Sequence, residues 1–311
     1  MSLLGKYKLG NIIGTGGFAF VMSAARIKDG LKVAIKFIQK RKVSKNGWVN
    51  NERLGKIPKE AFILQKVDSP FIIKFIDLVS DEKYFYLITE HHRPTILLPM
   101  QSETCLYQQI ETNINEKKLT SQTITLAKSI PQYRKGISSD LYDCLETQTC
   151  LQENTARWVF AQIVEGVYDL NKQGIYHRDI KDENCVIDQD FNVKLIDFGS
   201  AIILTETEKN SLFKKFYGTI PFASSEILKG ELYRIPEAEV WSLGVLLYII
   251  LNGTLPFTNT QMAIDGMISE PRFVYSDEIS KLITRCLQTS TEERATLEEI
   301  RQHPWVKRAW F

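Results

Sequence analysis

Long apolar runs, paired cysteines and a strong net charge are all missing from this 311-residue sequence. No run of about 18 apolar residues is present, the length that a helix needs to cross a bilayer. The first ten residues, MSLLGKYKLG, lack the apolar core of about 7–15 residues that a secretory signal peptide carries. The net charge of +2 is too small to predict binding to nucleic acid or to a membrane surface.

The five cysteines are scattered and form no C-x-x-C pair. Such a set favours a reducing compartment over a disulfide framework, so we expect the protein in the cytoplasm or the nucleus. The rest of the composition, with 44% hydrophobic and 24% charged residues, is ordinary for a globular protein.

The first ninety residues alternate short β-rich runs with turn signals. Five runs rich in Ile, Val, Phe and Tyr predict strands at residues 7–14, 19–27, 31–39, 72–80 and 84–90. A proline and apolar residues at helical spacing predict one helix among them, at residues 57–67.

From residue 155 onward the pattern becomes helical. Helices are predicted at residues 155–174, 237–253, 277–288 and 297–305. The first begins with Thr155, suited to N-capping, and the second is apolar nearly all round, as in a helix buried in a core. The sequence therefore predicts an α+β protein with a β-rich lobe, residues 7–92, and a larger helical lobe, residues 140–311.

Residues 93–139 fit neither pattern, because they are polar and show little periodicity. A structureless segment of this length is rare inside a compact domain. We interpret it as a low-order insertion between the lobes, with a docking or regulatory arm as the alternative.

A glycine-rich stretch, GTGGFAFV, joins the first two predicted strands at residues 14–21. Gly14 and Gly16 allow the backbone to bend sharply and bring its N–H groups close to phosphate oxygens. Any glycine-rich hairpin would look similar, so this motif alone is weak.

Lys36 stands inside the apolar third strand, in VAIK. A lysine is costly to bury without a partner, and Glu60 on the following helix can supply one. The alternative is an edge strand from which Lys36 reaches water.

The stretch GIYHRDIKDEN, residues 174–184, concentrates polar side chains directly after a predicted helix. Asp179 can accept a hydrogen bond from a substrate hydroxyl, and Lys181 can neutralise a transferred phosphoryl group. Asn184 offers an amide oxygen to Mg²⁺, which prefers oxygen ligands. His177 is more typical of a ring packed in the core.

Asp197, in LIDFGSA, supplies a second oxygen ligand. Residues 186–196 between Asn184 and Asp197 predict a hairpin, which would bring the two to one edge. Two unrelated loops would need several coincidences at once.

Together these motifs make the chain resemble a protein kinase. That family carries a Gly-rich loop, a lysine on the third strand, a catalytic loop H-R-D-x-x-x-x-N and then D-F-G. The resemblance covers nearly the whole chain apart from the insertion. It implies a bilobal fold whose smaller lobe is a five-stranded antiparallel sheet with one helix.

The resemblance also implies the site residues and the cofactors, ATP and Mg²⁺ with Mn²⁺ as an alternative. Lys36, paired to Glu60, would hold phosphates, Asp179 and Lys181 would act at the acceptor, and Asn184 and Asp197 would bind metal. The implied ATP-binding residues are Gly14, Thr15, Gly16, Gly17, Phe18, Ala19, Val21, Ala34, Lys36, Thr89, Glu90, His91, Asp140 and Val186. An apolar stack linking the lobes would comprise Leu64, Phe75, His177 and Phe198.

The acceptor class follows from the same resemblance. Lys181, two residues after Asp179, is typical of serine/threonine kinases, and Thr219 is expected to contact Asp179. Glu183 matches an acidic position with which many such kinases attract basic substrates, although a solvated Glu fits equally well. The expected partners are protein substrates with Ser or Thr acceptors, and a monomeric catalytic domain without nucleic acid or membrane is expected.

The segment after D-F-G departs from the family pattern at one position. Ser225 stands where a proline is usual, while Glu226 remains and is expected to pair with Arg294. Arg178 could receive a phosphate placed on Thr205, Thr207 or Ser211, although ordinary loop hydroxyls are the favoured interpretation.

A narrower resemblance is to PAS-domain-regulated kinases of the calcium/calmodulin-dependent group. It is carried by GWVNNERLGKIPKE, HRDIKDEN, KLIDFGSA and PEAEVWSLG. Glu239 replaces the usual Asp in the last of these, and its carboxylate could still brace the catalytic loop. We expect no PAS segment within these residues. A pseudokinase that binds partners without efficient transfer is the alternative function.

Overall fold

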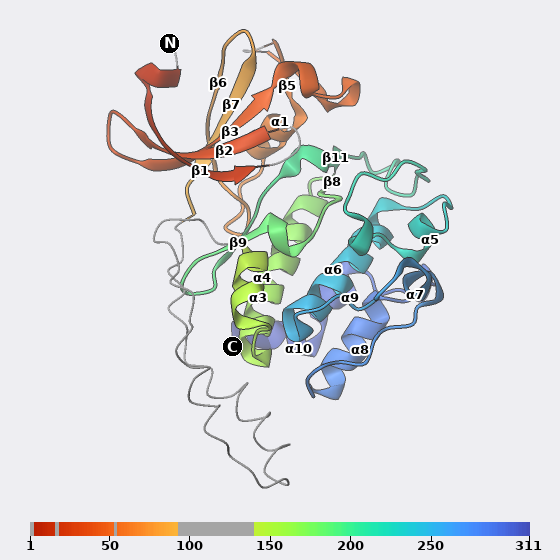
Figure 1. Ribbon diagram of the computed structural model, residues 1–311. Helices are drawn as coiled ribbons and strands as arrows, with labels where there is room; N and C mark the ends of the chain where they lie inside the picture. Colours follow the sequence, from red (N-terminus) through yellow and green to blue (C-terminus); the bar gives the residue numbers. More distant parts are fainter. Residues whose placement is uncertain (1–2, 16–18, 53–54, 93–139) are drawn as a thin grey trace, which may run out of the picture.

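The computed structural model describes residues 3–15, 19–52, 55–92 and 140–311 and arranges them in two lobes (Figure 1). The predicted insertion at residues 93–139 lies outside the described residues.

The smaller lobe is built on a five-stranded antiparallel sheet in the order β1-β2-β3-β7-β6. Its strands are β1 (Tyr7–Thr15), β2 (Ala19–Arg26), β3 (Lys32–Gln39), β6 (Phe75–Ser80) and β7 (Tyr84–Glu90). The predicted α+β fold class and the five strands are confirmed. The register opposes Val21 to Lys36 and Ala34 to Thr89, so these candidate site residues lie on adjoining strands.

A short hairpin precedes the helix of this lobe. It pairs β4 (Trp48–Asn51) with β5 (Gly55–Pro58), and α1 (Lys59–Lys66) follows directly. The sequence predicted the helix from residue 57, which was wrong, because Ile57 is fully buried as a strand residue. Proline fixes φ at a value that suits an extended residue as well as a first helical turn, so local sequence could not decide.

The larger lobe is helical. Its helices are α3 (Leu141–Gln148), α4 (Glu153–Asn171), α5 (Ser225–Leu228), α6 (Ile235–Asn252), α7 (Thr260–Asp265), α8 (Asp277–Cys286), α9 (Leu297–Gln302) and α10 (Pro304–Lys307). By length and composition α6 would suit a membrane span, but 78% of it is buried inside the protein, as predicted for a core helix. Gly253 ends α6 with φ +67°, a left-handed conformation that glycine adopts without steric cost.

Two helix predictions in the larger lobe need correction, and some helices were missed. α4 begins at Glu153 rather than at a Thr155 cap, and the Glu153 carboxylate accepts a 3.0 Å hydrogen bond from Trp305 Nε1. The predicted helix at 297–305 is divided, because His303 precedes a proline and such residues avoid the helical region. Helices α3, α5 and α7 were not predicted.

Short strands flank the segments that carry the candidate site residues. β9 (Cys185–Ile187) pairs with β10 (Val193–Leu195), which confirms the predicted hairpin, and β8 (Ile175–Tyr176) pairs with β11 (Ile202–Ile203). As predicted, the hairpin brings Asn184 and Asp197 to one edge, because the Ile196 N–H donates to the Asn184 carbonyl at 3.0 Å.

Candidate active site

A cavity of about 1270 Å³ lies between the lobes and is lined by both. Of the predicted nucleotide-binding residues, the cavity lining includes Gly14, Ala19, Val21, Ala34, Lys36, Thr89, Glu90, His91, Asp140 and Val186. Thr15 ends β1, while Gly16, Gly17 and Phe18 lie outside the described residues.

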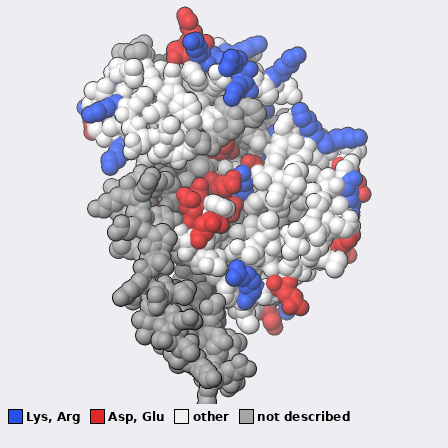
Figure 2. Space-filling view, viewed as in Figure 1, with Lys and Arg blue, Asp and Glu red and all other residues white. Residues whose placement is uncertain are grey.

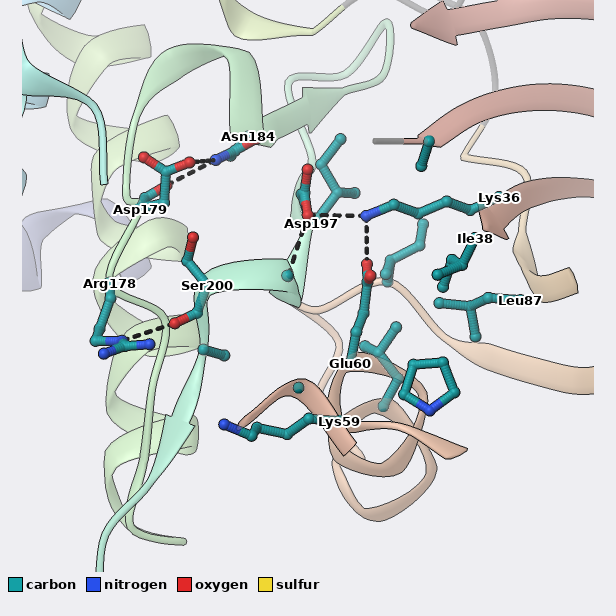
Figure 3. A pocket seen from close by; sticks show the side chains of 18 of the residues that line it. Lys36, Ile38, Lys59, Glu60, Leu87, Arg178, Asp179, Asn184, Asp197 and Ser200 are labelled. Carbon is teal, nitrogen blue, oxygen red and sulfur yellow. Dashed lines mark hydrogen bonds and ion pairs between the residues drawn. The ribbon is translucent and has the colours of Figure 1, made fainter. Parts of the chain in front are cut away.

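Three charged side chains meet at the back of this cavity (Figure 3). Lys36 Nζ lies 2.7 Å from Glu60 Oε1 and 2.8 Å from Asp197 Oδ1. Burial alone would lower the pKa of Lys36, but the two carboxylates outweigh it and raise that pKa. Burial likewise opposes the ionisation of Asp197, yet the ammonium of Lys36 holds its pKa at about 2. Lys36 is therefore charged and links both lobes.

Asp179 is held by donors from two segments. Thr219 Oγ1 donates to Asp179 Oδ1 at 2.8 Å, the contact that the kinase resemblance implied. Asn184 Nδ2 donates to the Asp179 carbonyl at 2.7 Å and to Oδ2 at 3.1 Å. Lys181 lines the same cavity and pairs with Glu183. The carboxylate is thus fixed in orientation beside a lysine.

Asn184 and Asp197 fit a divalent cation. Asn184 uses its amide nitrogen toward Asp179, which leaves the amide oxygen as its metal-binding atom. The Asp197 side chain is 50% exposed although one of its oxygens bonds Lys36. An amide and a carboxylate oxygen are donors that Mg²⁺ and Mn²⁺ accept. A bound cation would supply positive charge to neutralise phosphate oxygens.

The segment before Asp179 is braced from the core. The His177 ring is fully buried, its Nε2 lies 2.9 Å from the Ile196 carbonyl, and its centroid is 4.9 Å from that of Phe198. This fits the structural role predicted for it. Glu239 Oε1 accepts from the Arg178 N–H at 2.8 Å, as the sequence analysis expected of this longer carboxylate. Burial raises the pKa of Glu239 to about 7.

Asp140 has a structural contact that the sequence reading missed. Its Oδ1 accepts from the Asp143 N–H at 2.8 Å and so caps α3. Burial is the main cause that raises the pKa of Asp140 to about 6. Helix α3 itself was not predicted, so the cap could not be recognised from sequence.

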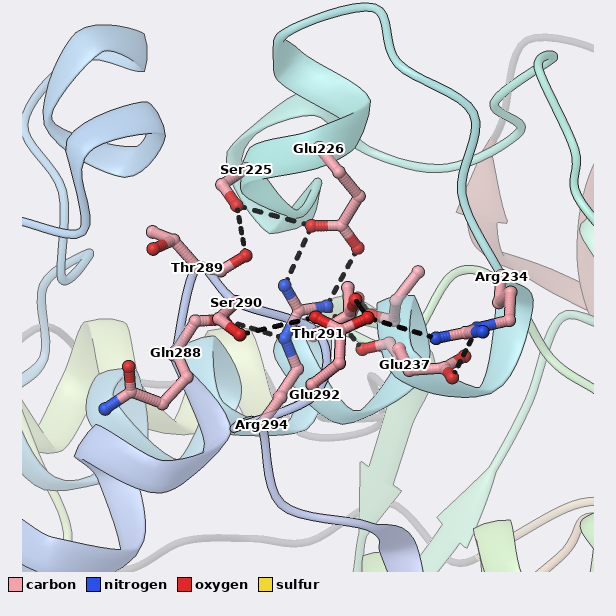
Figure 4. Close-up of polar contacts among 12 residues, drawn as sticks. Ser225, Glu226, Arg234, Glu237, Gln288, Thr289, Ser290, Thr291, Glu292 and Arg294 are labelled. Carbon is pink, nitrogen blue, oxygen red and sulfur yellow. Dashed lines mark hydrogen bonds and ion pairs between the residues drawn. The ribbon is translucent and has the colours of Figure 1, made fainter.

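The segment after Asp197 is anchored in the helical lobe (Figure 4). Arg294 Nη1 and Nη2 each donate to one oxygen of Glu226, both at 2.8 Å. Burial opposes the ionisation of Glu226, but Arg294 outweighs it and lowers the pKa. Ser225 Oγ contacts Glu226 Oε2 at 3.3 Å. The Glu226–Arg294 pair implied by the resemblance is present.

Arg178 contacts the same segment through an aromatic ring. Its guanidinium lies 4.6 Å from the Tyr217 ring centroid, and Lys215 Nζ lies 4.7 Å from that centroid. Its Nε donates to the Ser200 carbonyl at 2.6 Å. Sequence reasoning missed Tyr217, because no local pattern predicts that two cationic side chains will contact its ring. Phosphate binding by Arg178 stays a prediction.

Comparison with known proteins decides the family. The protein kinase domain model matches residues 7–130 and 132–306. The chain belongs to the protein kinase family. This membership confirms the resemblance that the motifs carried.

The chain is similar to several curated serine/threonine-protein kinases. The PAS domain-containing serine/threonine-protein kinase of Mus musculus is 36% identical over 97% of this chain, which spans 18% of that relative. The serine/threonine-protein kinase PSK2 of Saccharomyces cerevisiae is 32% identical to this chain. The match covers 95% of this chain and 23% of PSK2. CBL-interacting serine/threonine-protein kinase 13 of Arabidopsis thaliana is 28% identical over 99% of the chain and 52% of its length. The chain therefore spans about half or less of these relatives, and the similarity to PAS-domain kinases is confirmed.

Proposed function

We propose that this kinase domain transfers the γ-phosphate of ATP to Ser or Thr hydroxyls of protein substrates. The observation that carries the proposal is that Lys36 contacts both Glu60 and Asp197 while Thr219 and Asn184 orient Asp179. Phosphoryl transfer asks mainly for positioning and charge stabilisation, and these side chains supply both.

Each side chain then has a defined task. Lys36 binds the α- and β-phosphates, and Glu60 keeps its ammonium in place. Asp179 accepts the proton of the acceptor hydroxyl, and Lys181 neutralises charge on the transferred group. Asn184 and Asp197 hold the metal, with Mg²⁺ as the proposed ion and Mn²⁺ as the alternative.

The pseudokinase alternative is not favoured. Loss of one or more of the catalytic side chains is the usual sign of a pseudokinase, and here Lys36, Glu60, Asp179, Asn184 and Asp197 are all present. The relatives compared above are named as serine/threonine-protein kinases.

A preference for basic residues near the acceptor is part of the proposal. Acidic side chains gather where the lobes meet (Figure 2). Besides burial, the negative charges of Asp143, Asp182 and Glu183 raise the pKa of Asp140. A peptide with Arg or Lys would gain from this negative potential.

The remaining proposals rest on the sequence. The domain acts as a monomer in the cytoplasm or nucleus, with no nucleic acid or membrane as partner. Among the described residues, Cys144, Cys185 and Cys286 are free and buried, which agrees with a reducing compartment.

The test is transfer from γ-labelled ATP, with Mg²⁺, to a mixed Ser/Thr peptide library. We expect the natural sequence to label peptides with basic residues most strongly and Asp179→Asn to label none. No transfer by either protein would move the assignment to a binding role, and equal labelling by both would refute the role of Asp179.

A further inference from the structure

Lys194, on β10, contacts two other segments of the chain. Its Nζ lies 2.9 Å from Glu90 Oε1 at the end of β7 and donates to the Pro70 carbonyl at 3.0 Å. The same Glu90 oxygen accepts from the Lys74 N–H at 2.8 Å. We name this group, formed by Glu90, Lys194, the Pro70 carbonyl and the Lys74 N–H, the hinge clasp.

The hinge clasp connects β7 to β10 of the larger lobe and to the segment between α1 and β6. The Leu195 N–H donates to the Phe71 carbonyl at 2.8 Å, and the Ile73 N–H donates to the Leu195 carbonyl at 3.1 Å. The connection between α1 and β6 is therefore bonded to β10. Lys194, on β10, draws the Glu90 carboxylate to this unit.

Glu90 is also part of the cavity lining. Its carboxylate is engaged by Lys74 and Lys194, and its N–H donates to the Lys74 carbonyl at 2.9 Å. The backbone at Glu90 is therefore held from two directions at the place where the adenine ring of ATP is expected. Nothing in the predicted roles of the site residues includes Lys194.

We propose that Lys194 is a positioning residue that fixes the Glu90 backbone for adenine binding. This inference rests on the proposed function, because it needs ATP in the cavity. Lys194 does not touch nucleotide and acts only through Glu90.

The exposure of the pair sets the expected size of the effect. The side chains of Lys194 and Glu90 are 17% and 30% exposed, so solvent and salt screen this pair less than a surface ion pair. A hydrogen bond between charged groups contributes more than a neutral one. Losing it should weaken MgATP binding about tenfold.

The experiment measures the Kd of MgATP and of magnesium tripolyphosphate by calorimetry. For Lys194→Met we expect the Kd of MgATP to rise about tenfold, while the Kd of tripolyphosphate, which has no adenine, stays unchanged. Glu90→Gln should raise the Kd of MgATP by a similar factor. The double variant should bind MgATP no more weakly than the single variant with the higher Kd, because both substitutions remove the same interaction. Lys194→Arg should restore most of the affinity.

Lys6→Met is the matched control, since Lys6 forms, in the same lobe, a 2.9 Å ion pair with Asp77 that includes neither Glu90 nor Lys194. The KM for ATP should rise in Lys194→Met with kcat within about twofold, because Asp179 and Lys36 are untouched. An unchanged Kd, or equal weakening of both ligands, would overturn the inference. If the natural sequence bound neither tripolyphosphate nor ATP, the proposed function would be refuted, and this inference would be refuted with it.

Discussion

Two groups of paired charges in this protein differ in composition and in exposure to solvent. In the cleft, Lys36 serves two carboxylates, and its side chain is 18% exposed while that of Asp197 is 50% exposed. In the helical lobe, Arg294 serves the single carboxylate of Glu226, and their exposed fractions are 0% and 7%.

The difference separates a reactive cluster from a structural one. Arg294 and Glu226 neutralise each other, and Arg294 also donates to the carbonyls of Gln288 and Glu237, so the groups of this pair bond within the fold. The cleft cluster lines a cavity and carries one carboxylate more than its ammonium balances. That excess negative charge suits a metal ion, which would in turn neutralise phosphate oxygens.

Breaking the structural cluster should cost most stability. Arg294→Leu leaves Glu226 charged and buried, so we expect the free energy of unfolding to fall by about 3–5 kcal/mol. Urea denaturation measures this. The double variant Glu226→Leu/Arg294→Leu should recover part of the loss, and a double variant worse than the sum of the singles would contradict the description of the pair.

The buried carboxylate of Glu239 should make the stability of the protein depend on pH. Its pKa is raised from 4.5 to about 7 by burial, so its contribution to stability is complete below pH 4.5 and is lost as the pH rises toward 7. Glu239→Gln removes this titration and keeps an oxygen for the Arg178 N–H. Between pH 5 and 8 the free energy of unfolding of the natural sequence should fall relative to the variant by about 3 kcal/mol. Parallel curves would show that Glu239 does not titrate in this range.

Ser225→Pro should give the smallest effect. Ser225 is the first residue of α5, where proline is tolerated, and Ser224 before it is extended, with φ −72° and ψ 160°. The variant loses the 3.3 Å contact with Glu226 but limits the unfolded chain. We expect a change of under about 1 kcal/mol in the free energy of unfolding. A larger loss would mean that the hydroxyl contributes more to the anchor than its distance suggests.

The sequence predicted the parts of the site that local chemistry determines. Lys36 in an apolar strand needed an anionic partner. A hairpin between Asn184 and Asp197 places these two residues at the same edge. These two features could be predicted from the sequence, because the cost of burying a charge and the geometry of a hairpin leave few alternatives.

The missed features depend on contacts between distant segments. The β4–β5 hairpin exists because Ile57 is buried and Trp48 packs against Phe85, with ring centroids 5.9 Å apart. Lys194 reaches Glu90 across 104 positions of sequence, and no local pattern marks such a pair. Local propensity cannot report what a segment will meet after folding.

The central claim is that the cleft cluster serves phosphoryl transfer and not the fold, and Lys36→Met tests it most directly. The measurement is the rate of phosphate transfer from γ-labelled ATP to Ser/Thr peptides, at a temperature where circular dichroism shows both proteins folded. We predict a folded variant whose transfer falls by more than about a hundredfold, because the phosphates lose their buried ammonium. A folded variant that transfers phosphate at a near-natural rate would contradict the account.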